Sequence, residues 1–99
     1  MTLRVKISSR AAAQIRRAAD WWADNRASAP GAIAQDLEEC VALLADQPRI
    51  GSMYSGTRVG QVRRLYMGRV GYFIYYCVNG DDLQVLAFWH ARRGRQPRL

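Results

Sequence analysis

Residues 61–95, QVRRLYMGRVGYFIYYCVNGDDLQVLAFWHARRGR, form the stretch that decides the fold. The stretch contains three runs rich in β-branched and aromatic residues, which favour β-strands, at residues 62–67, 72–78 and 83–89. A glycine-containing turn separates the first two runs, and Asn79-Gly80, a strong hairpin signal, separates the last two. These features predict an antiparallel meander of three strands.

The N-terminal residues predict one strand followed by one helix. Apolar and basic residues alternate over residues 3–7, as they do in a half-buried strand. Ser8 or Ser9 then caps a helix, and apolar residues at three- and four-residue spacing continue this helix to about Asn25.

A second amphipathic helix is expected from Ser28 and Pro30, which favour a helix start, to Pro48, which stops it. Two consecutive helices with one apolar face each imply a helical hairpin. Residues 46–60 contain three glycines and little periodicity, so we expect a long loop there.

Together these elements predict a single α+β domain over residues 1–99, in which an N-terminal strand and a helical hairpin precede the three-stranded meander. A sheet of this kind needs a partner layer on one face. We therefore expect the helices to pack on one face and to leave the opposite face and the C-terminal edge open to a ligand.

The positive charge is concentrated in the C-terminal part of the chain. Eight arginines and two aspartates give residues 58–99 a net charge of +6, out of +7 for the whole chain. Fourteen of the fifteen basic residues are arginine, the cation best suited to bidentate contacts with phosphate or carboxylate. This charge favours polyanionic partners such as nucleic acid, an acidic protein surface or an acidic disordered segment.

The sequence does not indicate a secreted, membrane-spanning, metal-binding or disulfide-bonded protein. The N-terminus lacks the apolar run of a signal peptide, and the longest uncharged apolar stretch, residues 70–78, is too short to span a bilayer. We expect a cytoplasmic protein without a membrane partner. Cys40 and Cys77 lie far apart and the chain has one histidine, so we expect no metal site, no cofactor and no disulfide framework, but two buried thiols.

Arginines and aromatic residues are the candidates for binding. Arg63 and Arg64 point to opposite faces of one strand, and we expect Arg64 on the open face. A basic tail follows the last strand, and the candidate contact residues around it are Trp89, His90, Arg92, Arg93, Arg95 and Arg98. The alternatives are a solvated, frayed terminus for the arginines and a structural hydrogen bond for the histidine.

The remaining aromatic residues are expected mainly in the core. The tyrosines and phenylalanine of residues 66–76 could stack nucleic-acid bases, but they are also the residues from which a small β core is built. Trp21 and Trp22 project about 100° apart on their helix. We expect Trp22 in the core and Trp21 at a rim, where it is available to a binding partner.

The chain resembles the ParE/RelE superfamily of bacterial toxins, which antitoxins neutralise, and it is most similar to ParE. The resemblance covers the order strand, helix, helix and meander, with VRRL at residues 62–65, GYFIYY at 71–76 and WHARRG at 89–94. It implies a toxin of a type II toxin–antitoxin system that arrests growth in the bacterial cytoplasm. The order and spacing of the motifs carry the resemblance, since no one motif is diagnostic.

RelE-like members are ribosome-dependent mRNA endonucleases, which need a base, a cation for the phosphorane and a leaving-group acid. Arg64 and Arg93 match two basic positions of these enzymes, and His90 could serve as base or acid. However, Phe73 occupies the third basic position, and residues 91–99 lack the tail tyrosine. The resemblance to the nuclease branch is therefore incomplete.

ParE-like members bind DNA gyrase and trap it with cleaved DNA, without known chemistry of their own. This branch implies an inhibitor of gyrase that forms a hetero-oligomer with a cognate acidic antitoxin, whose C-terminal segment lies along the toxin. We favour this hypothesis. The alternatives are a nuclease acting on the ribosome and mRNA, and a relic that binds antitoxin without being toxic.

Overall fold

The computed structural model describes residues 2–58 and 60–99, which form two helices and one five-stranded sheet. The elements in chain order are β1 (Arg4–Ile7), α1 (Ser9–Asn25), α2 (Ala32–Asp46), β2 (Ser52–Met53), β3 (Arg63–Met67), β4 (Tyr72–Asn79) and β5 (Asp82–His90). The strand order across the sheet is β1-β5-β4-β3-β2. No helix in the described part of the chain has the length and apolar character needed to cross a membrane.

The structure confirms the predicted α+β class and extends the sheet beyond the predicted meander. β3, β4 and β5 form the antiparallel meander, and Gly80 takes the positive φ of 61° that the β4–β5 turn requires. β1 adds to β5 in a parallel direction, so the sheet is mixed. β2 pairs with β3 inside the segment predicted to be a loop, of which Val59 lies outside the described residues.

The parallel contact between β1 and β5 joins opposite ends of the chain. The Asp82 carboxylate, which follows the hairpin turn, forms ion pairs with Arg4 at 2.9 Å and with Lys6 at 3.6 Å. Beyond β1, α1 covers the remaining edge of β5, because Phe88 donates its N–H to Gln14 Oε1 at 2.8 Å. Ser8 caps α1 as expected, since its hydroxyl accepts from the Ala11 N–H at 3.0 Å.

The sequence predicted the boundaries of α1 better than the start of α2. α1 ends at Asn25, as expected. α2 begins at Ala32 rather than at Ser28 or Pro30, because residues 26–32 first form a pair of tight turns closed by backbone bonds from Ala29 to Arg26 and from Ala32 to Ala29. The prediction of the second helix start was therefore two to four residues too early.

A β-bulge at Leu86 divides the side chains of β5 between the two faces of the sheet. Tyr75 pairs with Ala87 while its neighbour Tyr76 pairs with Val85, so Leu86 is an extra residue in β5. As a result Val85 and Phe88 both pack against the helices, although they are three residues apart. Without the bulge, simple alternation would place them on opposite faces.

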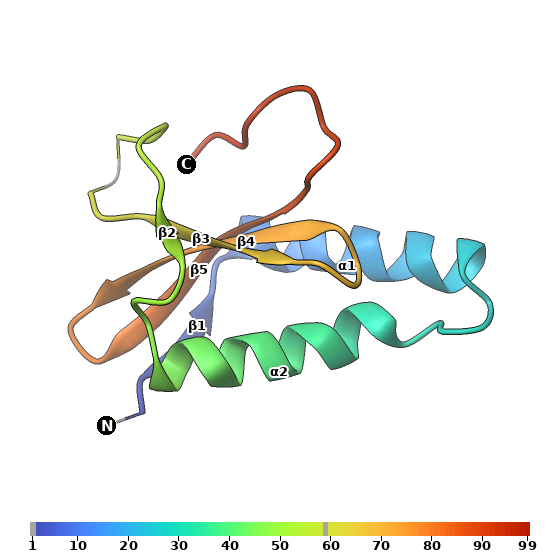
Figure 1. Cartoon of the computed structure of the whole chain (residues 1–99), viewed down its shortest axis with the longest axis horizontal. Helices are drawn as coiled ribbons and strands as arrows, with labels where there is room; N and C mark the ends of the chain where they lie inside the picture. Colours follow the sequence, from blue (N-terminus) through green and yellow to red (C-terminus); the bar gives the residue numbers. More distant parts are fainter. Residues whose placement is uncertain (1, 59) are drawn as a thin grey trace.

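Hydrophobic clusters lie on both faces of the sheet. The larger one packs the helices against the sheet, with Ile33 and Leu44 of α2 fully buried against Ile74 of β4. A smaller cluster on the outer face consists of Val62, Tyr75, Cys77 and Ala87. Figure 1 shows both helices along one side of the sheet, whereas the C-terminal tail and the β2–β3 loop rise on the other. The outer face is therefore partly covered rather than open, contrary to the expectation from the sequence.

Tyr76 ties the segment after α2 to the sheet. Its hydroxyl donates to the Pro48 carbonyl at 2.7 Å and accepts from the Gly51 N–H at 3.0 Å, and its side chain is fully buried. Burial raises the pKa of Tyr76, although the Gly51 bond opposes this, so the phenol stays neutral.

Replacing Tyr76 with Phe is expected to lower the free energy of unfolding by about 1–3 kcal/mol, because the buried Gly51 N–H and the Pro48 carbonyl both lose their partner. Urea denaturation measures this change. Tyr66→Phe is the matched control, since Tyr66 is 53% exposed, and it should leave stability unchanged. Equal stability of the two variants would show that the Tyr76 hydroxyl does not hold this segment.

Candidate functional site

The C-terminal tail, residues 91–99, folds back over the outer face of the sheet. Trp89 donates its indole N–H to the Arg95 carbonyl at 2.8 Å, and Arg10 donates to the Arg98 carbonyl. Pro97 is buried, and Leu99 packs against the cluster on the outer face. The basic tail is therefore fixed along the sheet rather than frayed.

Arg64 lies on the outer face, as alternation along β3 predicts, and it helps to hold the tail. Its guanidinium lies 4.4 Å from the ring centroid of Phe73 and donates to Gln96 Oε1 at 3.5 Å and to the Tyr75 hydroxyl at 3.3 Å. The Tyr75 hydroxyl in turn donates to Gln96 Oε1 at 3.1 Å. Arg63 points the other way and donates to the Gly51 carbonyl at 2.7 Å.

Tyr54 completes the surroundings of Arg64. Its ring meets Tyr75 edge-on at 5.0 Å, and the Arg64 guanidinium lies 5.5 Å from its centroid. Burial raises the pKa of Tyr54, and Tyr75 adds to this effect while Arg64 opposes it. The phenol stays neutral at physiological pH and is not an ionised base beside Arg64.

His90 is held on the helix-facing side of the sheet. Its ring meets Tyr72 edge-on at 4.9 Å, and Tyr72 stacks in parallel on Phe88 at 4.6 Å. His90 Nδ1 accepts the Arg92 N–H at 3.1 Å, which places the ring proton of this tautomer on Nε2. One of the two ring nitrogens is thus occupied by a structural hydrogen bond.

Of the three residues proposed for RNA cleavage, His90 and Arg93 line one groove, whereas Arg64 lies apart from them. Arg64 contacts Phe73 and Tyr75 on the outer face, whereas His90 packs with Tyr72 on the opposite face. Arg93 stacks on Trp89 at 4.1 Å, at the end of β5. The full set must reach one phosphodiester together, and the sheet separates Arg64 from His90 and Arg93.

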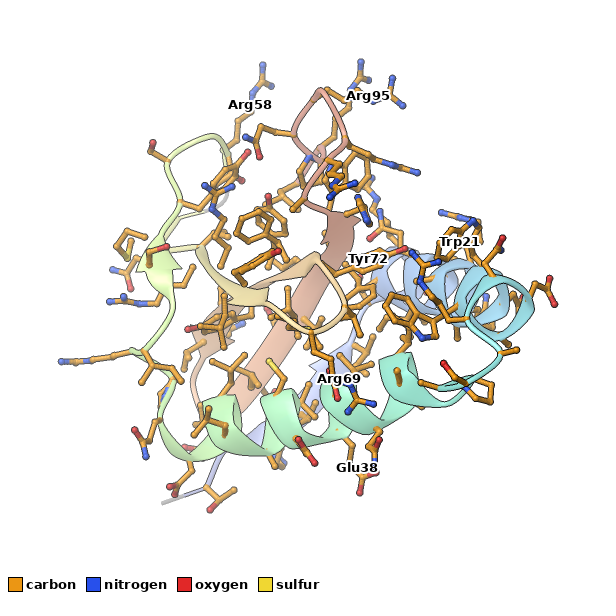
Figure 2. All side chains as sticks on the ribbon, turned by 45° about the vertical axis from the view of Figure 1, so that its right-hand side comes forward. Trp21, Glu38, Arg58, Arg69, Tyr72 and Arg95 are labelled. Atoms are coloured by element: carbon orange, nitrogen blue, oxygen red, sulfur yellow. The ribbon has the colours of Figure 1, made fainter. Side chains whose placement is uncertain are left out.

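A groove at the end of the sheet brings together four of the eight residues predicted to bind a partner. It has a volume of about 710 Å³ and lies between the end of α1, the β3–β4 turn and the start of the tail. Trp21 and His90 line it with Arg92 and Arg93, whereas Arg95 and Arg98 lie outside it. Figure 2 shows Trp21, Tyr72 and Arg69 around this groove.

Sequence reasoning missed four residues that shape these surfaces, namely Arg26, Tyr54, Arg69 and Gln96. Each acts through a contact with a distant segment, such as the ion pair of Arg69 with Asp36 of α2 at 2.9 Å. No local pattern marks such residues. Among the described residues, no group of three or more His, Cys, Asp or Glu side chains is placed to hold a metal ion.

The family model described as the ParE toxin of the type II toxin–antitoxin system, parDE, matches residues 5–95. The chain belongs to the ParE toxin family. A solved chain of the chromosomal ParDE TA system from P. aeruginosa has the same fold, with a TM-score of 0.73 and 24% sequence identity. The match covers 92% of this chain and 98% of that one. No curated protein matches the chain significantly.

Within this ParE fold, Trp89→Phe is expected to loosen the tail, because phenylalanine cannot donate to the Arg95 carbonyl. Loss of one such bond should raise the rate of tryptic cleavage after Arg95 about fivefold. Mass spectrometry of a limited digest measures the rate, with cleavage after Arg58 in the β2–β3 loop as internal control. If cleavage at both sites is unchanged, the indole bond does not restrain the tail.

Proposed function

We propose that this ParE-family toxin inhibits DNA gyrase by binding it and trapping it with cleaved DNA. The observation that carries the proposal is the separation of Arg64 from His90 by the sheet, in a chain that belongs to the ParE family. Inhibition by binding requires a surface but no assembled set of catalytic groups. The nuclease alternative requires such a set on one side of the sheet.

We further propose that a cognate acidic antitoxin neutralises the toxin in the bacterial cytoplasm, within a hetero-oligomer. The net charge of +6 on residues 58–99 would speed the encounter with such a partner and fix its register. The exposed side chains of Arg92, Arg95 and Arg98 and the rim residue Trp21 are the proposed contacts. Arg64 and Trp89 would act by holding the tail in place.

The proposal predicts that purified toxin increases the amount of gyrase-cleaved DNA and lowers supercoiling, and that the antitoxin encoded beside it reverses both effects. Agarose gels of plasmid incubated with gyrase measure both quantities. Absence of any effect from folded protein that still arrests growth would overturn the proposal. Absence of growth arrest as well would favour a relic that only binds antitoxin.

His90→Ala separates inhibition by binding from catalysis. We expect this variant to keep at least about half of the wild-type effect on gyrase, because the histidine ring packs against Tyr72 and performs no chemistry. Arg92→Ala/Arg95→Ala, which removes two exposed tail charges, should reduce inhibition about tenfold or more. The opposite ranking of the two variants would point to a catalytic histidine.

A further inference from the structure

The groove at the end of the sheet has the charge of a site for a polyanion. Arginines reach it from three separate segments: Arg26 from the end of α1, Arg69 from the β3–β4 turn, and Arg92 and Arg93 from the tail. Asp36 neutralises Arg69, but no carboxylate is among the described residues that line the groove. Three cations thus face one concave surface without an acidic partner in its lining.

Two large aromatic side chains border the same groove and remain exposed. Trp21 is 48% exposed, and Tyr66 on β3 is 53% exposed. Trp21 touches Trp22 only edge-on, at a centroid distance of 6.2 Å and an interplanar angle of 64°. The Arg26 guanidinium lies 5.3 Å from the Trp21 ring, so a cation and an exposed aromatic ring stand side by side.

Arginines alternating with exposed aromatic rings are the features by which proteins bind single-stranded nucleic acid, because the cations contact phosphates and the rings stack on bases. In duplex DNA the bases are stacked on one another, so their faces are not available to the rings of Trp21 and Tyr66. An amphipathic acidic helix would need large exposed aliphatic side chains, but among the described lining residues Val70 is 3% exposed and the exposed Ala91 offers only a methyl group. An extended peptide would need a run of free strand edge. β1 and β2 do not line the groove, and of β3, whose edge β2 leaves unpaired beyond Arg64, Tyr66 alone among the described residues lines it.

We propose that this groove binds single-stranded nucleic acid without sequence preference. Arg26, Arg92 and Arg93 contact successive phosphates, and the Trp21 ring stacks on a base, with Tyr66 available to a second one. The binding needs no gyrase and goes beyond the function proposed above. Binding of nucleic acid by the groove is therefore measured separately from the inhibition of supercoiling.

Fluorescence anisotropy with a labelled oligothymidylate of about 15 nucleotides tests the proposal on the full chain, at about 50 mM and about 200 mM NaCl. Trp21→Ala should weaken binding about tenfold through loss of stacking. Arg26→Gln/Arg92→Gln should weaken binding and reduce the salt slope by roughly 0.7 for each phosphate contact removed. Circular dichroism and thermal melting show whether each variant is folded.

The matched control is Arg49→Gln/Arg58→Gln, which removes the same number of charges from exposed positions outside the groove. Figure 2 shows Arg58 at the tip of the β2–β3 loop, away from Trp21. The control should lose less than about a third of the affinity lost by the groove variant, because it changes only the overall field. If Trp21→Ala does not fold, Tyr66→Ala and the arginine pair provide the test.

Three results would overturn the proposal. One is no binding of the oligonucleotide by folded wild-type protein at the lower salt concentration. Another is equal loss of affinity in the groove and control variants, which would assign the binding to net charge alone. The third is tighter binding of duplex DNA or of a polyglutamate peptide of matched charge, which would assign the groove to a different class of partner.

Discussion

The β-bulge at Leu86 is the constraint on which the arrangement of the functional side chains depends. It lets Val85 and Phe88 both face the helices and therefore reverses the alternation for the last residues of β5. Trp89 consequently points to the outer face, and His90 to the helix-facing side. With a regular strand His90 would share a face with Arg64.

This reversal divides the basic residues between two surfaces. On the outer face Arg64, Tyr75 and Gln96 form a hydrogen-bonded group that holds the tail down. At the end of the sheet His90 and the first tail arginines line an open groove with Trp21. The first group stabilises the fold, whereas the second leaves cations and aromatic rings exposed to a partner.

The sequence predicts the elements that depend on neighbouring residues. Asn79-Gly80 gives the β4–β5 turn, Ser8 caps α1, and the aromatic runs give the three strands of the meander. Arg63 and Arg64 lie on opposite faces as the alternation requires, and Trp22 packs against the core while Trp21 remains exposed.

Features that depend on distant contacts could not be predicted in this way. The parallel pairing of β1 with β5 links Arg4 to Asp82, which lie 78 positions apart. Folding of the tail over the sheet depends on Gln96 meeting Arg64 across 32 positions. The bulge has no local signal in VLAF, residues 85–88, because all four residues are apolar. The same four residues in a regular strand would bury their side chains equally well, with those of Ala87 and Phe88 on the opposite faces. The groove likewise forms from α1, one turn and the tail, so no single stretch of sequence marks it.

The sheet separates Arg64 from His90, so that these two side chains do not form one site for cleaving RNA. Primer extension on an mRNA in a purified translation reaction tests this claim most directly. Our account predicts the same full-length products with and without the toxin. Toxin-dependent truncated products that disappear with both His90→Ala and Arg64→Ala would contradict it, because two residues on opposite faces would then act on one phosphodiester.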